Sequence, residues 1–158
     1  METQSFRRIL ELFEAHGVEY VVVGGVAAVL QGAPVTTFDI DTLVRIEAAN
    51  ADRLVAALTA LEARYREQRS ATLRPSREDI LAGGHLLLMT NSGPLDVLGF
   101  IGNHRRYEDL AAAADVLDIG GLSVRVLGLE DLIKEKRALA RDKDQAMLRM
   151  LEEVLRRR

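Results

Sequence analysis

The chain has 158 residues and no cysteine, so we expect one domain over residues 1–158 and exclude disulfides, thiolate zinc sites and cysteine nucleophiles. Its net charge of −3 provides no general basic field, so no stable complex with DNA is expected. No apolar run is long enough for a bilayer and no secretory signal is visible, which predicts a cytoplasmic protein without membrane contact.

Hydrophobic periodicity and turn residues predict helices and strands in mixed order. The expected elements are a helix over 5–15 ended by Gly17, a strand over 19–23, a helix over 26–31, a strand over 37–46, a helix capped by Asn50 and continuing to about 66, a hairpin of strands 85–90 and 94–100, a helix over 105–114, a hairpin of strands 115–119 and 122–126, and one long helix or two joined helices from 129 onward. Residues 67–84 read as a loop with a short strand near 72–73. This order predicts an α+β fold with a mixed sheet flanked by helices and a long C-terminal helix.

The paired glycines Gly24 and Gly25 follow a run of apolar residues, Tyr20-Val21-Val22-Val23. The run reads as a buried strand that ends at the glycines, just before a helical stretch. Glycines at such a turn allow backbone N–H groups to approach a phosphate, and the start of a helix favours an anion. We therefore expect Gly24 and Gly25 to bind the phosphates of a nucleotide.

Two aspartates, Asp39 and Asp41, lie in the next expected strand. Residues two apart on a strand point to the same side, so both carboxylates would share one face, while Phe38 and Ile40 would face a core. Two adjacent hard oxygen ligands suit Mg²⁺, which keeps several waters and binds phosphate oxygens of a substrate. The alternative for a lone Asp-x-Asp is a turn cap or a solvent-facing pair.

This ordered set of residues resembles the nucleotidyltransferases of the DNA polymerase β superfamily. Over roughly residues 18–145 the sequence looks like the small bacterial members, both minimal and toxin-type. The family signature is a glycine pair, a spacer, Asp-x-Asp and a third carboxylate on a later strand. The third position matches Asp96, which interrupts the apolar segment 94–98.

The resemblance implies a Mg²⁺-dependent enzyme that moves a nucleoside monophosphate from a nucleoside triphosphate (NTP) to a hydroxyl group, with pyrophosphate leaving. In the family the first two aspartates bind two metal ions and the third binds the catalytic one, where it can also act as a base. Carried over by motif, Asp39, Asp41 and Asp96 are the catalytic and metal-binding residues.

Two lysines near the C-terminus, Lys136 and Lys143, fall on a helical stripe that otherwise carries apolar residues. A buried lysine needs a partner, and a triphosphate or the aspartate cluster would provide one. The alternatives are lysines that extend to the helix edge, or a helix that breaks near Arg141 and Asp142. We expect both lysines to contact the nucleotide. Family members often have a turn with glycine and proline here, which this chain lacks.

Thr37 precedes the acidic pair, and its hydroxyl is expected either to reach a phosphate or to support the strand. Relatives often have an arginine just before this threonine pair, where this chain has Val35. His85 and His104 are isolated in the sequence, so a zinc site is not expected. With only 4% aromatic residues, the chain is not expected to form broad base-stacking platforms.

The acceptor is not specified by the sequence. The family includes enzymes that modify tRNA ends, protein hydroxyls and small molecules, and the basic runs 105–106 and 156–158 would contact phosphates if the acceptor were tRNA. A partner chain or homodimer would complete a site in so short a chain, which includes the toxin or enzyme part of a toxin–antitoxin pair. The rival from another class is a non-catalytic nucleotide- or partner-binding module. A phosphohydrolase is disfavoured because no histidine is placed to activate water.

Overall fold

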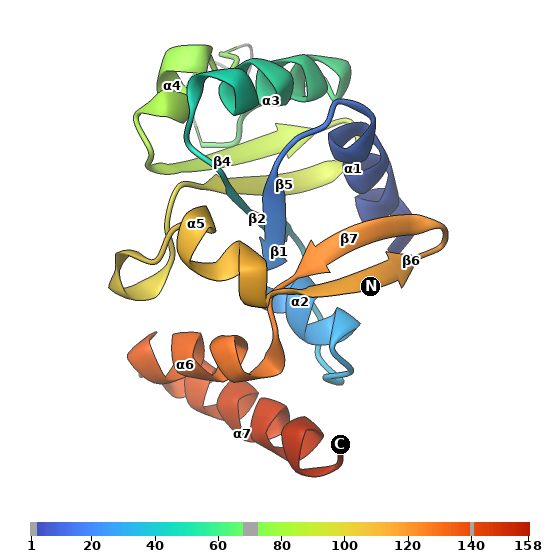
Figure 1. The fold of residues 1–158 in the computed structure, drawn as a ribbon, viewed down its shortest axis with the longest axis vertical. Coiled ribbons are helices and arrows are strands. Elements are labelled where there is room, and N and C mark those ends of the chain that lie inside the picture. Colours follow the sequence, from blue (N-terminus) through green and yellow to red (C-terminus); the bar gives the residue numbers. More distant parts are fainter. Residues whose placement is uncertain (1–2, 68–72, 140) are drawn as a thin grey trace.

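The computed structural model describes residues 3–67, 73–139 and 141–158, with the side chains of 3–5 and 143 outside the description. These residues form an α+β structure in which helices flank one mixed sheet (Figure 1). The α-helices of this described part are α1 (Thr3–Ala15), α2 (Gly24–Leu30), α3 (Ala48–Ala60), α4 (Arg77–Leu81), α5 (Tyr107–Leu110), α6 (Leu129–Leu139) and α7 (Asp142–Arg156). The fold class expected from the sequence is confirmed.

The sheet of the described residues has seven strands in the order β3-β4-β5-β2-β1-β7-β6. The strands are β1 (Tyr20–Val23), β2 (Ile40–Val44), β3 (Arg64–Tyr65), β4 (His85–Thr90), β5 (Gly93–Leu98), β6 (Asp115–Ile119) and β7 (Leu122–Val126). At the centre, β2 is antiparallel to β1 and parallel to β5. This pairing places the start of β2 beside the end of β1 and in register with β5. Both expected hairpins, β4–β5 and β6–β7, are confirmed.

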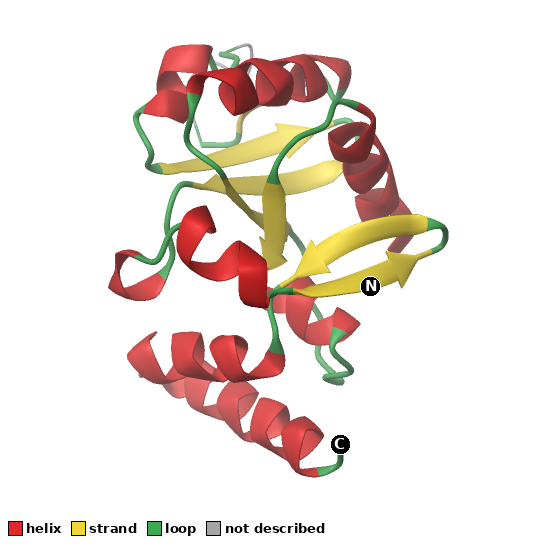
Figure 2. Cartoon of the chain, viewed as in Figure 1, coloured by secondary structure: helices red, strands yellow, loops and turns green. Residues whose placement is uncertain are grey.

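The core lies between the central strands and the helices that cover them (Figure 2). All four residues of β1 are buried, which explains why this run lacks the polar alternation of a half-exposed strand. Phe13 of α1 packs edge-on against the Tyr20 ring at a centroid distance of 5.0 Å. Leu54 and Leu58 of α3 are buried in the same cluster. The predicted amphipathic faces of α1 and α3 therefore form this core.

The C-terminal segment is two helices, α6 and α7, that pack against each other below the sheet in the view of Figure 1. The break falls beside Arg141, one of the two possibilities that the sequence left open. Asp144 fixes this turn: its buried carboxylate accepts hydrogen bonds from Arg141 Nε at 2.6 Å and from Lys136 Nζ at 3.3 Å. An ion-pair cluster thus takes the place of glycine and proline. No described helix is both long and apolar enough to cross a membrane.

The cap and the end of α3 differ from the prediction. Glu47, not Asn50, is the N-cap, and its side chain accepts the Asn50 N–H at 3.0 Å. Asn50 is buried inside the helix, where its side chain bonds both backbone groups of Glu19 and so fixes α3 to the segment entering β1. The helix ends at Ala60 rather than near 66. Glu62 has a left-handed backbone (φ 53°) there, a turn made without the usual glycine signal.

The segment expected to be a loop contains the short helix α4. Ser76 accepts the backbone N–H of Asp79, and the Asp79 carboxylate accepts the N–H of Ser76, a reciprocal capping box visible in the sequence as Ser-x-x-Asp. The short strand expected near 72–73 is not found at Leu73, although the Leu73 carbonyl accepts the Tyr65 N–H, and Thr72 lies outside the described residues. The third strand forms at Arg64–Tyr65 instead.

Two boundaries near the acidic pair also move. Helix α2 begins at Gly24 itself, two residues earlier than expected, and β2 begins only at Ile40. The alternation rule therefore does not extend back to Phe38. The Phe38 ring was expected in the core and is instead 83% exposed, whereas Ile40 is buried as expected. Likewise the expected helix over 105–114 starts at Tyr107 and continues after Leu110 only as a 3₁₀ turn.

Candidate active site

Three carboxylates converge at the start of β2. Asp41 lies on β2 directly opposite Asp96 of the parallel strand β5 and opposite Val23 at the end of β1. Asp39 comes from the bend just before β2 and reaches the same point. One oxygen from each of the three residues lies within 4.8 Å of the other two. The structure therefore brings together Asp39, Asp41 and Asp96. Asp39, however, lies just before the strand in which it was expected.

The electrostatics of this cluster favour a bound cation. Burial, reinforced by the charges of Asp39 and Asp96, raises the pKa of Asp41 to about 8. Burial and the Asp96 charge also raise the pKa of Asp39. The Oδ1 atom of Asp41 is buried with no hydrogen-bond partner in the described structure, and such an acceptor is costly unless something binds it. Hard carboxylate oxygens with an unsatisfied member fit a divalent metal ion such as Mg²⁺.

The paired glycines are required because other groups occupy the space of their side chains. Gly24 has a left-handed backbone (φ +66°), and a Cβ there would lie 2.2 Å from Asp41 Oδ2. A Cβ on Gly25 would lie 2.6 Å from Thr37 Oγ1. The glycines therefore let the end of β1 approach both the carboxylate and the loop before it. Their contact with phosphate stays a prediction.

Thr37 supports the loop that carries the first carboxylate. Its hydroxyl donates a hydrogen bond to the Asp39 carbonyl at 3.1 Å, and its side chain packs against Gly25. This arrangement agrees with the supporting role that the sequence offered as one of two possibilities. In this arrangement the hydroxyl proton is used within the loop, so nucleotide contact by Thr37 stays a prediction.

A cavity of about 180 Å³ opens beside the carboxylates, and its lining includes Gly24, Asp41, Lys136 and Arg141. Lys136 lowers the pKa of Asp41, against the larger effects that raise it. The same lysine forms an ion pair with Asp144, so it interacts with two carboxylates, those of Asp41 and Asp144. Two cations at the mouth of an acidic cluster can attract phosphate oxygens while the acids hold a metal. The side chain of Lys143 lies outside the described residues, and its role stays a prediction.

Arg66 is a site residue that the sequence did not reveal. Its Nη2 atom lies 2.6 Å from Asp96 Oδ1, and both side chains are mostly buried. The backbone of Arg66 continues the pairing of β3 with β4, since its N–H bonds the Leu87 carbonyl and Leu87 is the cross-strand partner of Asp96. The sequence predicted a helix to about residue 66, so it did not predict this strand pairing, and no local motif marks Arg66.

No family model and no curated protein matches the sequence, but several solved structures match its fold. The lincosamide antibiotic adenylyltransferase LnuA, solved with lincomycin bound, is 14% identical and aligns 98% of each chain with a TM-score of 0.66. The antibiotic-resistance factor ANT(2'')-Ia is 19% identical, with 98% of this chain and 86% of that chain covered and a TM-score of 0.65. This chain has the nucleotidyltransferase fold.

A structure described as a nucleotidyltransferase of Thermotoga maritima, TM1012, agrees with this result. It is 19% identical, covers 99% of this chain and 93% of its own, and gives a TM-score of 0.60. At these identities the likeness concerns the fold alone. The nucleotidyltransferase fold implied by the resemblance in the sequence is thus confirmed, whereas membership of the DNA polymerase β superfamily and the roles of the individual residues stay predictions.

Proposed function

We propose that this protein is a divalent metal-dependent nucleotidyltransferase that moves a nucleoside monophosphate from an NTP to a hydroxyl acceptor. The observation that carries the proposal is the convergence of Asp39, Asp41 and Asp96 with an unsatisfied buried oxygen on Asp41. Burial and mutual repulsion both disfavour three ionised carboxylates in one cluster, and the raised pKa of Asp41 records that cost. A protein with no cation to bind would gain from losing one of them. This supports the enzyme over the non-catalytic module.

Each group of the site has a separate task in the proposed reaction. The acceptor oxygen bonds to the α-phosphorus as the bond from that phosphorus to the pyrophosphate oxygen breaks. Lys136 and Arg141 would hold the phosphates in the cavity beside Asp41. Asp96 would accept the hydroxyl proton on the oxygen that Arg66 leaves open. Bound at the three carboxylates, the metal would neutralise the triphosphate and favour ionisation of the hydroxyl.

The acceptor that we propose is a small molecule carrying hydroxyl groups. The arginine pair considered for RNA contact includes Arg105, which is committed to ion pairs with Asp131 and Glu135. In the terminal run, Arg156 and Arg157 both pair with Glu153. Among solved structures with this fold, LnuA holds lincomycin and ANT(2'')-Ia holds adenylyl-2''-tobramycin, which supports the same choice. A toxin–antitoxin pairing and a homodimer stay predictions.

A label-transfer assay tests this function directly. Each NTP, labelled at the α-phosphate, is incubated with Mg²⁺, the protein and one of three acceptor pools: total tRNA, total protein, or hydroxyl-bearing antibiotics. We expect label on the small-molecule pool, pyrophosphate released in equal amount, and neither product from a variant with Asp39→Asn and Asp41→Asn. Label on tRNA or protein would show that this macromolecule, and not a small molecule, is the acceptor. If the protein neither bound nor transferred any NTP, the proposed enzyme activity would be contradicted.

Lys136→Met is expected to raise the KM for the NTP about 10- to 150-fold, because a charge-assisted hydrogen bond to phosphate contributes roughly 1.5–3 kcal/mol. Asp144 would keep its bond to Arg141, so the fold should persist. Lys134→Met is the matched control, since Lys134 lies on the same helix but is exposed and lines a different cavity. Initial rates over a range of NTP concentrations measure both. Equal KM values in the two variants would show that Lys136 does not bind the NTP.

A further inference from the structure

A second cavity adjoins the cavity beside Asp41. Its volume is about 350 Å³, at the lower end of the range for small-molecule sites. Four residues line both cavities, from the end of β5, the loop after it and helix α6: Leu98, Ile101, Glu135 and Leu139. A ligand whose phosphates lay beside Asp41 and Lys136 would therefore extend directly into this second space.

The wall of the second cavity carries a row of three aromatic rings. The Phe100 ring lies between His85 and His104, with centroid distances of 4.7 Å and 4.9 Å and interplanar angles of 39° and 33°. His104 follows Phe100 by four residues, whereas His85 lies 15 residues before Phe100 and meets it because β4 pairs with β5. A hydrogen bond between His85 Nε2 and the Phe100 carbonyl at 3.1 Å holds the first pair. His85 and His104 are both exposed and both line the cavity.

The loop that presents His104 is held in an unusual conformation. Asn103 and His104 both have left-handed backbones, with φ of 61° and 53°. Such residues cost free energy and persist only where the surroundings impose them, commonly at binding sites. Here the surroundings are the bridge between Ile101 and Arg105 and the bond from the Gly102 N–H to Glu135 at 2.8 Å.

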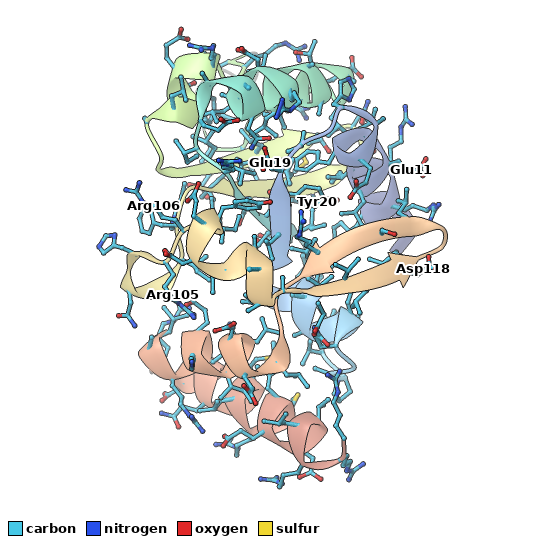
Figure 3. All side chains as sticks on the ribbon, in the orientation of Figure 1. Glu11, Glu19, Tyr20, Arg105, Arg106 and Asp118 are labelled. Carbon is cyan, nitrogen blue, oxygen red and sulfur yellow. The ribbon has the colours of Figure 1, made fainter. Side chains whose placement is uncertain are left out.

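Arg105 completes this restraint from the other end of the loop. It lies between the loop and α6 (Figure 3) and pairs with Asp131 at 2.9 Å and with Glu135 at 3.3 Å. All three side chains are largely buried, and the two carboxylates lie one helical turn apart. The aromatic row is therefore fixed to the same helix that carries Lys136.

We propose that the row of rings forms the stacking site for the base of the NTP, with the base on the exposed ring of His104 and with Phe100 supporting that ring from the other side. The site lies next to the groups assigned to its phosphates, and a row of rings offers a flat surface of the kind that bases stack on. Neither ring imposes a fixed pattern of donors, so the site would accept more than one base. The inference rests on the proposed function, because it places the base by continuity with the phosphate site.

The test compares ligands with and without a base. Binding of ATP and of inorganic tripolyphosphate, each with Mg²⁺, is measured by calorimetry for the wild type, His104→Ala and Phe100→Leu. We expect the wild type to bind ATP more tightly than tripolyphosphate. Each variant should weaken ATP binding between about 5-fold and about 150-fold, the range for one stacked base, and leave tripolyphosphate unchanged. His16→Ala, at the end of α1, is the matched control and should change neither.

The remaining outcomes overturn the proposal in distinguishable ways. Equal wild-type affinity for ATP and tripolyphosphate, or equal losses for both in the variants, would exclude base stacking and leave the proposed transferase intact. Unchanged ATP binding with a raised KM for the acceptor would assign the cavity to the acceptor. No wild-type binding of either ligand would overturn the proposed function together with this site. Thermal melting of each variant confirms that it is folded.

Discussion

Replacing Asp41 with asparagine is expected to abolish nucleotidyl transfer while making the metal-free protein more stable at pH 8. Loss of a metal ligand should lower the rate by more than the roughly 10- to 100-fold typical of residues that only support a ligand. Stability should move the other way because the carboxylate of Asp41 is buried among like charges. Asparagine keeps the size of the side chain, removes the charge and can donate a hydrogen bond to a neighbouring aspartate.

The pH dependence follows from the raised pKa of Asp41. The pKa is 3.8 for an unperturbed aspartate and about 8 in the folded protein, so the folded state holds this proton more tightly than the unfolded state. The resulting stability is fully present below about pH 4 and is lost as the pH rises toward 8. Asp39 shifts in the same direction. The metal-free wild type should therefore melt at progressively lower temperature over this range.

Thermal melting at pH 5 and pH 8, in a chelator and in Mg²⁺, measures these effects. In the chelator the wild type should lose more of its melting temperature between the two pH values than Asp41→Asn does. Mg²⁺ at pH 8 should raise the melting temperature of the wild type and leave the variant nearly unchanged. Asp52→Asn, an exposed aspartate outside the site, controls for loss of one negative charge. A variant less stable than the wild type at pH 8 without metal would contradict the proposed strain.

The part of the site that the sequence revealed is the part encoded locally. Gly24 and Gly25 stand at the end of an apolar run, and Asp41 follows within the next strand, so a short stretch of sequence contains both the close approach and the carboxylate. Asp96 was found through the family resemblance, and the parallel register of β2 with β5 explains its position. Hydrophobic period and turn chemistry sufficed for Gly24, Gly25 and Asp41 because each of them depends on its immediate neighbours.

The parts that were missed depend on pairing between distant strands. Arg66 reaches Asp96 only because β3 joins the sheet beside β4, and the His85 ring meets Phe100 only because β4 returns as β5. The prediction that Phe38 faces the core was wrong for a different reason. Strand alternation was applied to a residue that precedes the first residue of β2. A sequence pattern fixes which side a residue faces only inside the element that produces the pattern.

The turn between α6 and α7 shows how one structural solution can replace another. The glycine and proline that family members often have in this turn are absent, yet the buried Asp144 binds both Lys136 and Arg141. The direct bonds from Arg141 lower the pKa of Asp144, as expected for a carboxylate that stays ionised at its buried position. The cluster therefore closes the turn and also orients the two cations beside Asp41.

Gly24→Ala is expected to reduce activity at least about 100-fold, because displacement of a reacting group by about 1 Å has effects of that size. The new Cβ would lie 2.2 Å from Asp41 Oδ2, so either the carboxylate or the end of β1 must move. The variant should also lose roughly 1–2 kcal/mol of stability from alanine at a left-handed backbone position. Transfer rates at saturating NTP and chemical denaturation measure the two losses.

Gly83→Ala separates the two effects. Gly83 has a similar backbone conformation, with φ +77° against +66° at Gly24, but nothing lies within 4 Å of its Cβ position. Alanine there should cost about the same 1–2 kcal/mol of stability and leave the transfer rate unchanged. If both variants lost activity together, the loss would follow from general destabilisation. If Gly24→Ala alone is inactive while both are equally destabilised, the glycine acts by leaving space for Asp41.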